Sequence, residues 1–334
     1  MTLKKTILIG IDGASFTLLR ELFDRGVMPN MKALSEEGVF RSMTAALPDN
    51  SAVSWSSIMT GTNPGEHGVF GFTDLIPGTY TLRFPNSRNL RAKPFWHQHP
   101  ERKYVVLNLP FTYPARELNG VLISGFVSPD ISKSVYPAGL LEYLKETGYR
   151  TDADAGKFHK SETLFLDELS QVLETRCRVS RKLFTEQEWD TFMLVFTGSD
   201  RLGHFLTHAY EAGGGQLFDK YLEYYRRVDE EIGWIVSRVD EPFSLIMMSD
   251  HGMERIELEA NINSLLADNG FLKLKPGKRV NYNNIEAETK AFALEPSRIH
   301  LNIKGKYPNG NVLKEDAQNI IEDLSILFNK WEYE

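Results

Sequence analysis

The stretch KTILIGIDGASFTLLRELFDRG, residues 5–26, is the part of the sequence that decides the fold class. Residues 6–11 form a nearly unbroken apolar run, which is typical of a parallel strand covered on both of its faces. Asp12 and Gly13 break this run, and apolar residues then recur at helical spacing from Phe16 onward. A strand followed directly by a helix is the repeating unit of α/β proteins.

Four more apolar runs predict strands of the same kind, at residues 104–110, 120–125, 191–198 and 243–252. Helical patterns lie between these runs. We therefore expect an α/β fold with a doubly wound, mostly parallel central sheet that is flanked by helices.

The length of 334 residues fits one large α/β domain or two modest ones. We expect a single catalytic domain over residues 1–334. Because residues 128–188 lack clear strand patterns, we expect them to form a helical insertion or cap within this domain.

Composition and charge exclude some classes of protein. The formal net charge of −7 argues against binding to a nucleic-acid polymer, which needs a basic surface. A phosphate ester substrate is compatible with this charge, because bound metal ions can supply positive charge locally. Cys177 is the single cysteine, so no disulfide forms within the chain. No apolar stretch approaches the length of a membrane span, and the N-terminal apolar run is too short for a signal peptide. We expect a soluble, cytoplasmic protein without a membrane contact.

Three of the predicted strands end in metal-ligating residue types. Asp12 follows the first strand, Asp200 and His204 follow the strand at 191–198, and Asp250 and His251 follow residues 243–249. Ligands bind at the carboxyl ends of the strands in open parallel sheets, so these side chains are expected to meet at one edge. Taken one at a time, an Asp after a first strand is commonly a turn or N-cap residue, and an Asp and a His four residues apart occur by chance.

Mixed carboxylate and imidazole ligands suit zinc, with manganese as the alternative. Five ligands exceed what one tetrahedral zinc ion needs. We therefore predict two divalent metal ions, a pair that can hold both oxygens of a phosphoryl displacement.

The stretch PDNSAVSWSSIMTGTNPGEHG, residues 48–68, offers hydroxyl groups as nucleophiles: Ser51, Ser54, Ser56, Ser57 and Thr60. Residues 51–60 read as a short helix that ends at Gly61. Ser51 then lies at the N-terminus, where backbone N–H groups and the helix dipole favour an anion. The alternative is that Ser51 is only an N-cap.

These motifs together resemble the type I phosphodiesterase/nucleotide pyrophosphatase branch of the alkaline phosphatase superfamily. The resemblance is carried by IGIDGAS, SAVSWSSIMTGTNPGEHGVFGF, GSDRLGH and SDHGM. It implies that Ser51, nine residues before the TG dipeptide, is the nucleophile. It also implies one metal ion among Asp12, Ser51, Asp250 and His251. Asp200 and His204 would hold the second ion.

The chain departs from this pattern in three places. A serine replaces the threonine usual in nucleotide pyrophosphatases. Phe72 stands where that branch has an asparagine that contacts phosphate, which leaves Asp74 or a backbone amide for this contact. No histidine follows Val312, so the last metal ligand would be His300 or a solvent molecule, or it is absent.

The leading prediction is a phosphoesterase, most simply a phosphodiesterase or nucleotide pyrophosphatase, that hydrolyses a small-molecule phosphate ester through a phosphoseryl intermediate on Ser51. Two alternatives keep the same fold: a phosphotransferase that uses the same site, and a non-catalytic binding or scaffold protein. A sulfatase is disfavoured, because the residues after Ser51 lack the Pro and Arg needed to form formylglycine.

Overall fold

The computed structural model describes residues 4–275, 282–295 and 298–331. Within this part the chain is organised in two compact units. The first unit comprises residues 1–70 and 86–255, and the second comprises residues 71–85 and 256–334.

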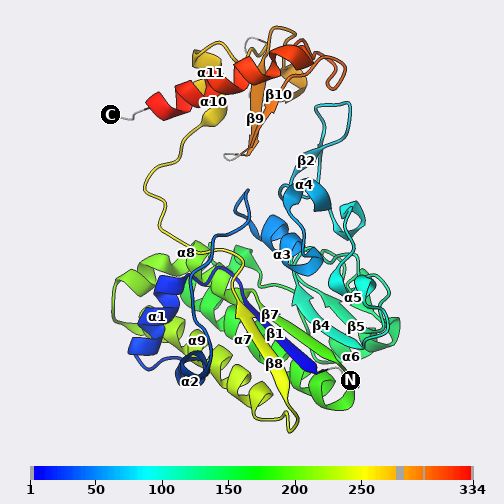
Figure 1. Cartoon of the computed structure of the whole chain (residues 1–334). Helices are drawn as coiled ribbons and strands as arrows, with labels where there is room; N and C mark the ends of the chain where they lie inside the picture. The colour runs from blue at the N-terminus through cyan, green and yellow to red at the C-terminus, as the bar shows by residue number, and fades with distance from the viewer. Residues whose placement is uncertain (1–3, 276–281, 296–297, 332–334) are drawn as a thin grey trace. The chain divides into compact units, whose positions relative to one another are not determined.

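The first unit is built on a sheet of six strands in the order β6-β5-β4-β7-β1-β8 (Figure 1). The strands are β1 (Lys5–Ile11), β4 (Tyr104–Leu109), β5 (Gly120–Ser124), β6 (Val135–Tyr136), β7 (Thr191–Phe196) and β8 (Phe243–Met248). All neighbouring strands are parallel except β6, which pairs antiparallel with β5. The prediction of an α/β fold with a mostly parallel central sheet is confirmed.

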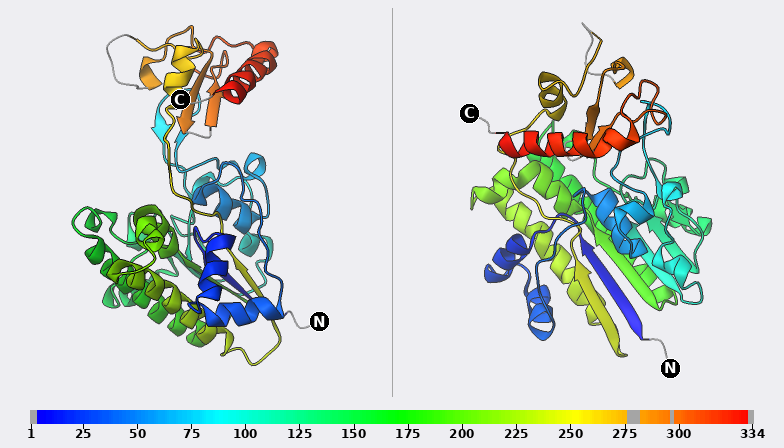
Figure 2. Two further views of the ribbon diagram at one scale, coloured as in Figure 1. Left: turned by 90° about the vertical axis from the view of Figure 1, so that its left-hand side faces the viewer. Right: turned by 45° about the horizontal axis from the view of Figure 1, so that its top comes forward.

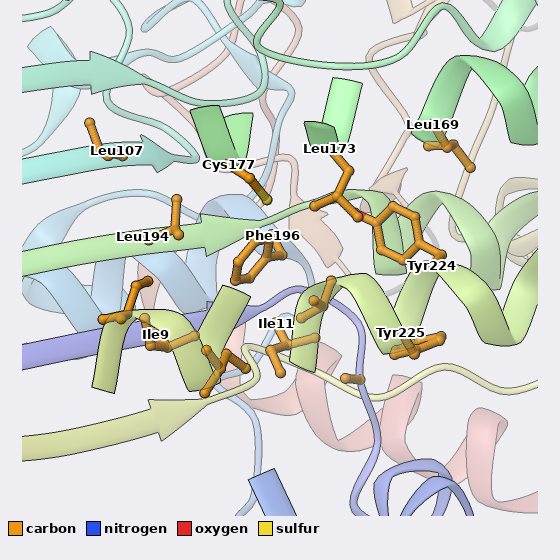
Figure 3. Packing of buried hydrophobic residues seen from close by; sticks show 14 of the residues in the cluster. Ile9, Ile11, Leu107, Leu169, Leu173, Cys177, Leu194, Phe196, Tyr224 and Tyr225 are labelled. Atoms are coloured by element: carbon orange, nitrogen blue, oxygen red, sulfur yellow. The ribbon is translucent and has the colours of Figure 1, made fainter. Parts of the chain in front are cut away.

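Helices cover both faces of this sheet. They are α1 (Phe16–Asp24), α2 (Pro29–Glu37), α3 (Ser51–Thr60), α4 (Pro64–His67), α5 (Phe95–Gln98), α6 (Leu141–Glu146), α7 (Glu162–Glu186), α8 (Gly198–Glu211) and α9 (Gln216–Val236). Side chains alternate between the faces of a strand, so Ile7, Ile9 and Ile11 share one face of β1. These isoleucines join the core formed with α1, α2, α7 and α9, and Figure 3 shows part of it around Cys177 and Phe196.

The opposite face of β1 is where α3 packs. Gly10 lies on that face, and a β-carbon placed on it would be 2.4 Å from Cη2 of Trp55. Only glycine allows this close approach of α3 to the strand. The packing of Trp55 over Gly10 therefore fixes α3, with Ser51 at its start, beside the end of β1 (Figure 2).

Segment 128–188 contains β6, α6 and α7. The sequence analysis missed β6, which has only two residues, too few to show a strand pattern. Helix α7 carries buried side chains such as Leu166, Leu169 and Leu173 at helical spacing, and it packs against β4 and β7. The expectation of one catalytic domain with a helical insertion at 128–188 stays a prediction.

The second unit has its own hydrophobic core. Its elements are β2 (Asp74–Leu75), β3 (Leu82–Arg83), α10 (Ile262–Asp268), β9 (Ala291–Glu295), β10 (Arg298–Leu301) and α11 (Ala317–Lys330). The rings of Tyr80 and Tyr307 stack with centroids 5.5 Å apart, and both contact Phe292. In the part of the chain that the structure describes, no helix is both long and apolar enough to cross a membrane.

Candidate active site

The turns after three neighbouring strands bring the predicted ligands together. Strand β1 lies between β7 and β8, so the residues that follow these strands meet at one edge of the sheet. Asp12 follows β1 directly, and Asp200 lies in the first turn of α8, just after β7. Asp250 and His251 lie in the loop after β8.

We call these residues the Asp/His cluster: Asp12, Asp200, His204, Asp250 and His251. Nε2 of His251 lies 3.4 Å from Oδ2 of Asp250, 3.6 Å from Oδ1 of Asp12 and 3.9 Å from Oδ1 of Asp200. Nε2 of His204 lies 3.3 Å from Oδ1 of Asp200. One ligand atom from each of Asp12, Asp250 and His251 lies within 4.8 Å of the other two, as in a metal site.

Backbone groups hold the two turns against each other. The N–H of Gly13 donates to Oδ1 of Asp250, and the N–H of Ala14 donates to Oγ of Ser249. The Ser249 hydroxyl in turn donates to the carbonyl of His251. Nδ1 of His251 lies 2.8 Å from the carbonyl oxygen of Gly252, which can only accept, so Nδ1 carries the proton. In the neutral ring, the lone pair of Nε2 then faces the carboxylates.

Ser51 is the one predicted nucleophile that contacts the Asp/His cluster in the described residues. Its Oγ lies 3.0 Å from Nε2 of His251 and 3.3 Å from Oδ1 of Asp12, both of which can accept its proton. The N-cap of α3 is Asn50, whose side chain accepts from the N–H of Val53. The Ser51 hydroxyl is therefore not used as the helix cap.

The other candidate hydroxyls have different surroundings. Those of Ser56 and Thr60 donate to carbonyls of their own helix. Ser57 contacts Nε2 of His67, a buried ring that also accepts from the N–H of Val69. Ser54 Oγ is buried and has no hydrogen-bond partner among the described residues.

Trp55 is a site residue that the sequence analysis missed. Its indole N–H donates to Oδ2 of Asp12 at 2.9 Å, and its side chain is fully buried. The sequence offered two signals, a tryptophan one helical turn after Ser51 and Gly10 inside the first strand. Neither signal shows that Trp55 and Gly10 are neighbours in the fold.

The electrostatics of the Asp/His cluster suit a cation. Burial raises the pKa of Asp12, and the negative charges of Asp250 and Asp200 raise it further. Burial also raises the pKa of Asp250, against the lowering effect of His251. Oδ1 of Asp200 and Oδ2 of Asp250 are buried without a hydrogen-bond partner among the described residues. Buried carboxylates of this kind are paired or coordinate a metal, and this mixed oxygen and nitrogen donor set fits a divalent transition metal.

A cavity of about 620 Å³ adjoins the Asp/His cluster. Asp250 and His251 form part of its lining, and Phe16, Met43 and Met248 contribute apolar walls. Ser51, Asp12 and Asp200 are not part of its lining.

The remaining positions considered in the sequence lie in the second unit. His300 stacks on Phe292 with ring centroids 5.4 Å apart, and Nδ1 of His300 is 3.3 Å from the Tyr307 hydroxyl. Asp74 pairs with Arg83. Phe72 also belongs to this unit. That Asp74 contacts phosphate in place of the missing asparagine, or that His300 is the last metal ligand, stays a prediction.

Comparison with known proteins gives a family and a fold. The model of the type I phosphodiesterase/nucleotide pyrophosphatase family matches residues 6–329. No curated protein matches the chain in sequence.

Matching solved structures include phosphonoacetate hydrolase from Sinorhizobium meliloti 1021 in complex with phosphonoformate and with phosphonoacetate. In both cases the identity is 18%, the TM-score is 0.57, and the match covers 80% of this chain and 62% of the hydrolase chain. The chain thus spans less than two thirds of that relative, and at this identity the similarity shows the fold.

Proposed function

Since the chain belongs to the type I phosphodiesterase/nucleotide pyrophosphatase family, we propose that it is a metal-dependent phosphoesterase that acts through Ser51. The observation that carries this proposal is the contact of the Ser51 hydroxyl with the Asp/His cluster. A hydroxyl at the start of a helix, beside buried carboxylates and an imidazole, is the arrangement that an activated nucleophile requires.

Two sets of residues would hold divalent metal ions. Asp12, Asp250 and His251 would hold the first together with Ser51, and Asp200 and His204 would hold the second. Zinc suits these ligands best, and manganese is the alternative. Bound there, such ions would lower the pKa of the Ser51 hydroxyl and neutralise charge on the phosphoryl group.

The proposed reaction has two steps. In the first, Ser51 Oγ forms a bond to phosphorus, the bond from phosphorus to the leaving oxygen breaks, and the leaving alkoxide takes a proton from solvent and departs as the alcohol. Oδ1 of Asp12, within hydrogen-bond distance of the hydroxyl, is placed to accept its proton. Water then attacks the phosphorus of the phosphoseryl group, the bond from phosphorus to Ser51 Oγ breaks, and the proton held by Asp12 returns to Oγ, which restores Ser51 and releases the phosphoryl product.

The direct test is Ser51→Ala, measured with bis(p-nitrophenyl) phosphate and with metal content determined on the same sample. We expect turnover to fall by about 10³-fold or more while metal stays bound, because the nucleophile is lost. Ser54→Ala is the matched control, since this hydroxyl lies on the same helix without a hydrogen bond to the Asp/His cluster. Unchanged turnover in Ser51→Ala would rule out the proposed nucleophile.

The same preparation separates this proposal from its alternatives. Product analysis by mass spectrometry in the presence of acceptor alcohols distinguishes transfer from hydrolysis. A protein that binds no zinc at micromolar concentration would favour a non-catalytic role. The substrate screen includes aryl monoesters, aryl diesters, dinucleotide polyphosphates and phosphonoacetate, the last because the structural neighbour is a phosphonoacetate hydrolase.

A further inference from the structure

Among the described residues, Arg201 is the arginine whose side chain pairs with a carboxylate of the Asp/His cluster. Its Nη1 lies 3.7 Å from Oδ2 of Asp200. Among the described residues, no other arginine or lysine forms an ion pair with Asp12, Asp200 or Asp250. The Arg201 side chain is only 14% exposed, so this charge is largely removed from water.

Two other segments of the chain hold the guanidinium group in place. Nε of Arg201 donates to both carboxylate oxygens of Asp152 at 3.1 Å, and Nη2 donates to Oδ2 of Asp152. The guanidinium carbon lies 4.3 Å from the ring centre of Phe126. A planar group gripped along one edge and stacked on a ring has little rotational freedom.

The contacts with Asp152 use Nε and Nη2, and Nη1 faces Asp200. Nη1 forms no hydrogen bond within the described residues, since its contact with Asp200 is longer than a hydrogen bond. Burial by itself would lower the pKa of Arg201, but Asp152, Asp200 and Asp12 raise it, so the group is permanently charged. Nη1 is thus a fixed, partly desolvated N–H donor beside Asp200, a carboxylate of the Asp/His cluster, and such charged donors bind phosphoryl oxygens in other sites.

We propose that Arg201 is the phosphate-binding residue of this site and that Nη1 donates to a non-bridging phosphoryl oxygen of the substrate. Asp152 acts as the positioning residue for Arg201. This inference rests on the proposed function and names its substrate class. A permanent positive charge gains more from a dianionic phosphoryl group than from a monoanionic one, so monoesters and phosphonates are favoured over diesters.

The test compares Arg201→Gln with the unaltered protein on p-nitrophenyl phosphate, a dianion, and bis(p-nitrophenyl) phosphate, a monoanion. We expect kcat/KM to fall about 100-fold for the monoester and about 10-fold or less for the diester, as expected for a lost charged hydrogen bond. Inorganic phosphate should bind at least about 10-fold more weakly by titration calorimetry. Arg201→Lys keeps the positive charge, so its loss of kcat/KM for the monoester should be smaller than that of Arg201→Gln. Asp152→Asn should lower the ratio of kcat/KM for the monoester to kcat/KM for the diester, by a smaller factor than Arg201→Gln.

Arg178→Gln is the matched control, because Arg178 is an exposed arginine on α7 that pairs with Glu174. Equal losses for the two substrates, or unchanged values in Arg201→Gln, would overturn the inference. If Arg201→Gln does not fold, the same comparison of kcat/KM for monoester and diester is made with Arg201→Lys and Asp152→Asn, and an unchanged ratio in both variants would overturn the inference. If the unaltered protein hydrolyses neither substrate, the proposed function fails. The phosphate titration still tests Arg201 in that case, and equal phosphate affinity in the unaltered protein and Arg201→Gln would overturn the inference.

Discussion

Replacing Gly10 by alanine is expected to disturb the packing of α3 on β1 that positions Ser51. The new β-carbon would lie 2.4 Å from Cη2 of Trp55 and 3.1 Å from Cζ3 of that ring and from Cγ2 of Val195. Carbon atoms pack at about 3.5–4.0 Å, so the ring must shift. Trp55 is fully buried, and its indole N–H donates a hydrogen bond to Asp12. The shift of the ring therefore moves α3 or breaks this hydrogen bond.

The size of the effect follows from two opposing contributions. Overpacking a buried site typically costs about 1–3 kcal/mol. Removing a glycine from a strand interior returns about 0.5–1 kcal/mol. From the midpoints of these ranges we expect Gly10→Ala to lower the free energy of unfolding by a net amount of about 1.3 kcal/mol. Turnover should also fall, because Ser51 lies one helical turn before Trp55 on the same helix.

A double-mutant cycle in urea denaturation checks the cause. Trp55→Phe removes the atoms that would clash, so Gly10→Ala should cost less in that background, with a coupling of about 1 kcal/mol. Gly139→Ala serves as control, since nothing lies within 4 Å of a β-carbon at that position. If Gly10→Ala is as stable as the unaltered protein, or costs the same in both backgrounds, the packing argument is wrong.

Two further predictions concern titratable groups that are not members of the Asp/His cluster, the partly buried His300 and the buried Cys177. Burial, with the nearby charges of Arg298 and Lys306, lowers the pKa of His300 to about 4. An unfolded histidine takes up its proton near pH 6.5, so the free energy of unfolding should decrease between pH 6.5 and 4, by on the order of 3 kcal/mol. Urea denaturation of His300→Gln should lack this part of the pH dependence, and identical pH profiles would contradict the assignment. Burial also raises the pKa of the Cys177 thiol. Iodoacetamide at pH 8, followed by mass spectrometry, should therefore leave Cys177 unlabelled in the folded protein and label it in urea. Rapid labelling without urea would show that the thiol is accessible.

Much of the fold could be predicted because parallel strands leave a direct trace in the sequence. Strands β4 and β7 are buried along their whole length and β1 over most of its second half, and all three are apolar runs in the sequence. Gly61 ends α3 with a left-handed backbone, as its position predicts. The sequence does not encode strand order locally. That β1 lies between β7 and β8 follows from packing of the whole sheet, although the rule that ligands gather at strand ends was enough to expect the Asp/His cluster.

The residues that the sequence analysis missed act through contacts between distant segments. Arg201, Asp152 and Phe126 come from three separate parts of the chain, and no local pattern relates them. Trp55 and Gly10 are likewise far apart in sequence. The second unit combines residues 71–85 with residues 256–334, a combination that only long-range contacts define.

The Asp/His cluster makes sense as a functional feature and not as a stabilising one. Asp12, Asp250 and His251 have ligand atoms within 4.8 Å of one another. At an effective dielectric constant of about 20, two carboxylates at such a separation repel each other by about 3 kcal/mol. Arg201 already pairs with Asp152, so its charge offsets only part of this repulsion. Trp55, Gly13 and Ser249 nevertheless hold the groups in place with hydrogen bonds. A fold that keeps repelling charges buried and oriented, with a hydroxyl beside them, is what the proposed metal-dependent phosphoesterase requires.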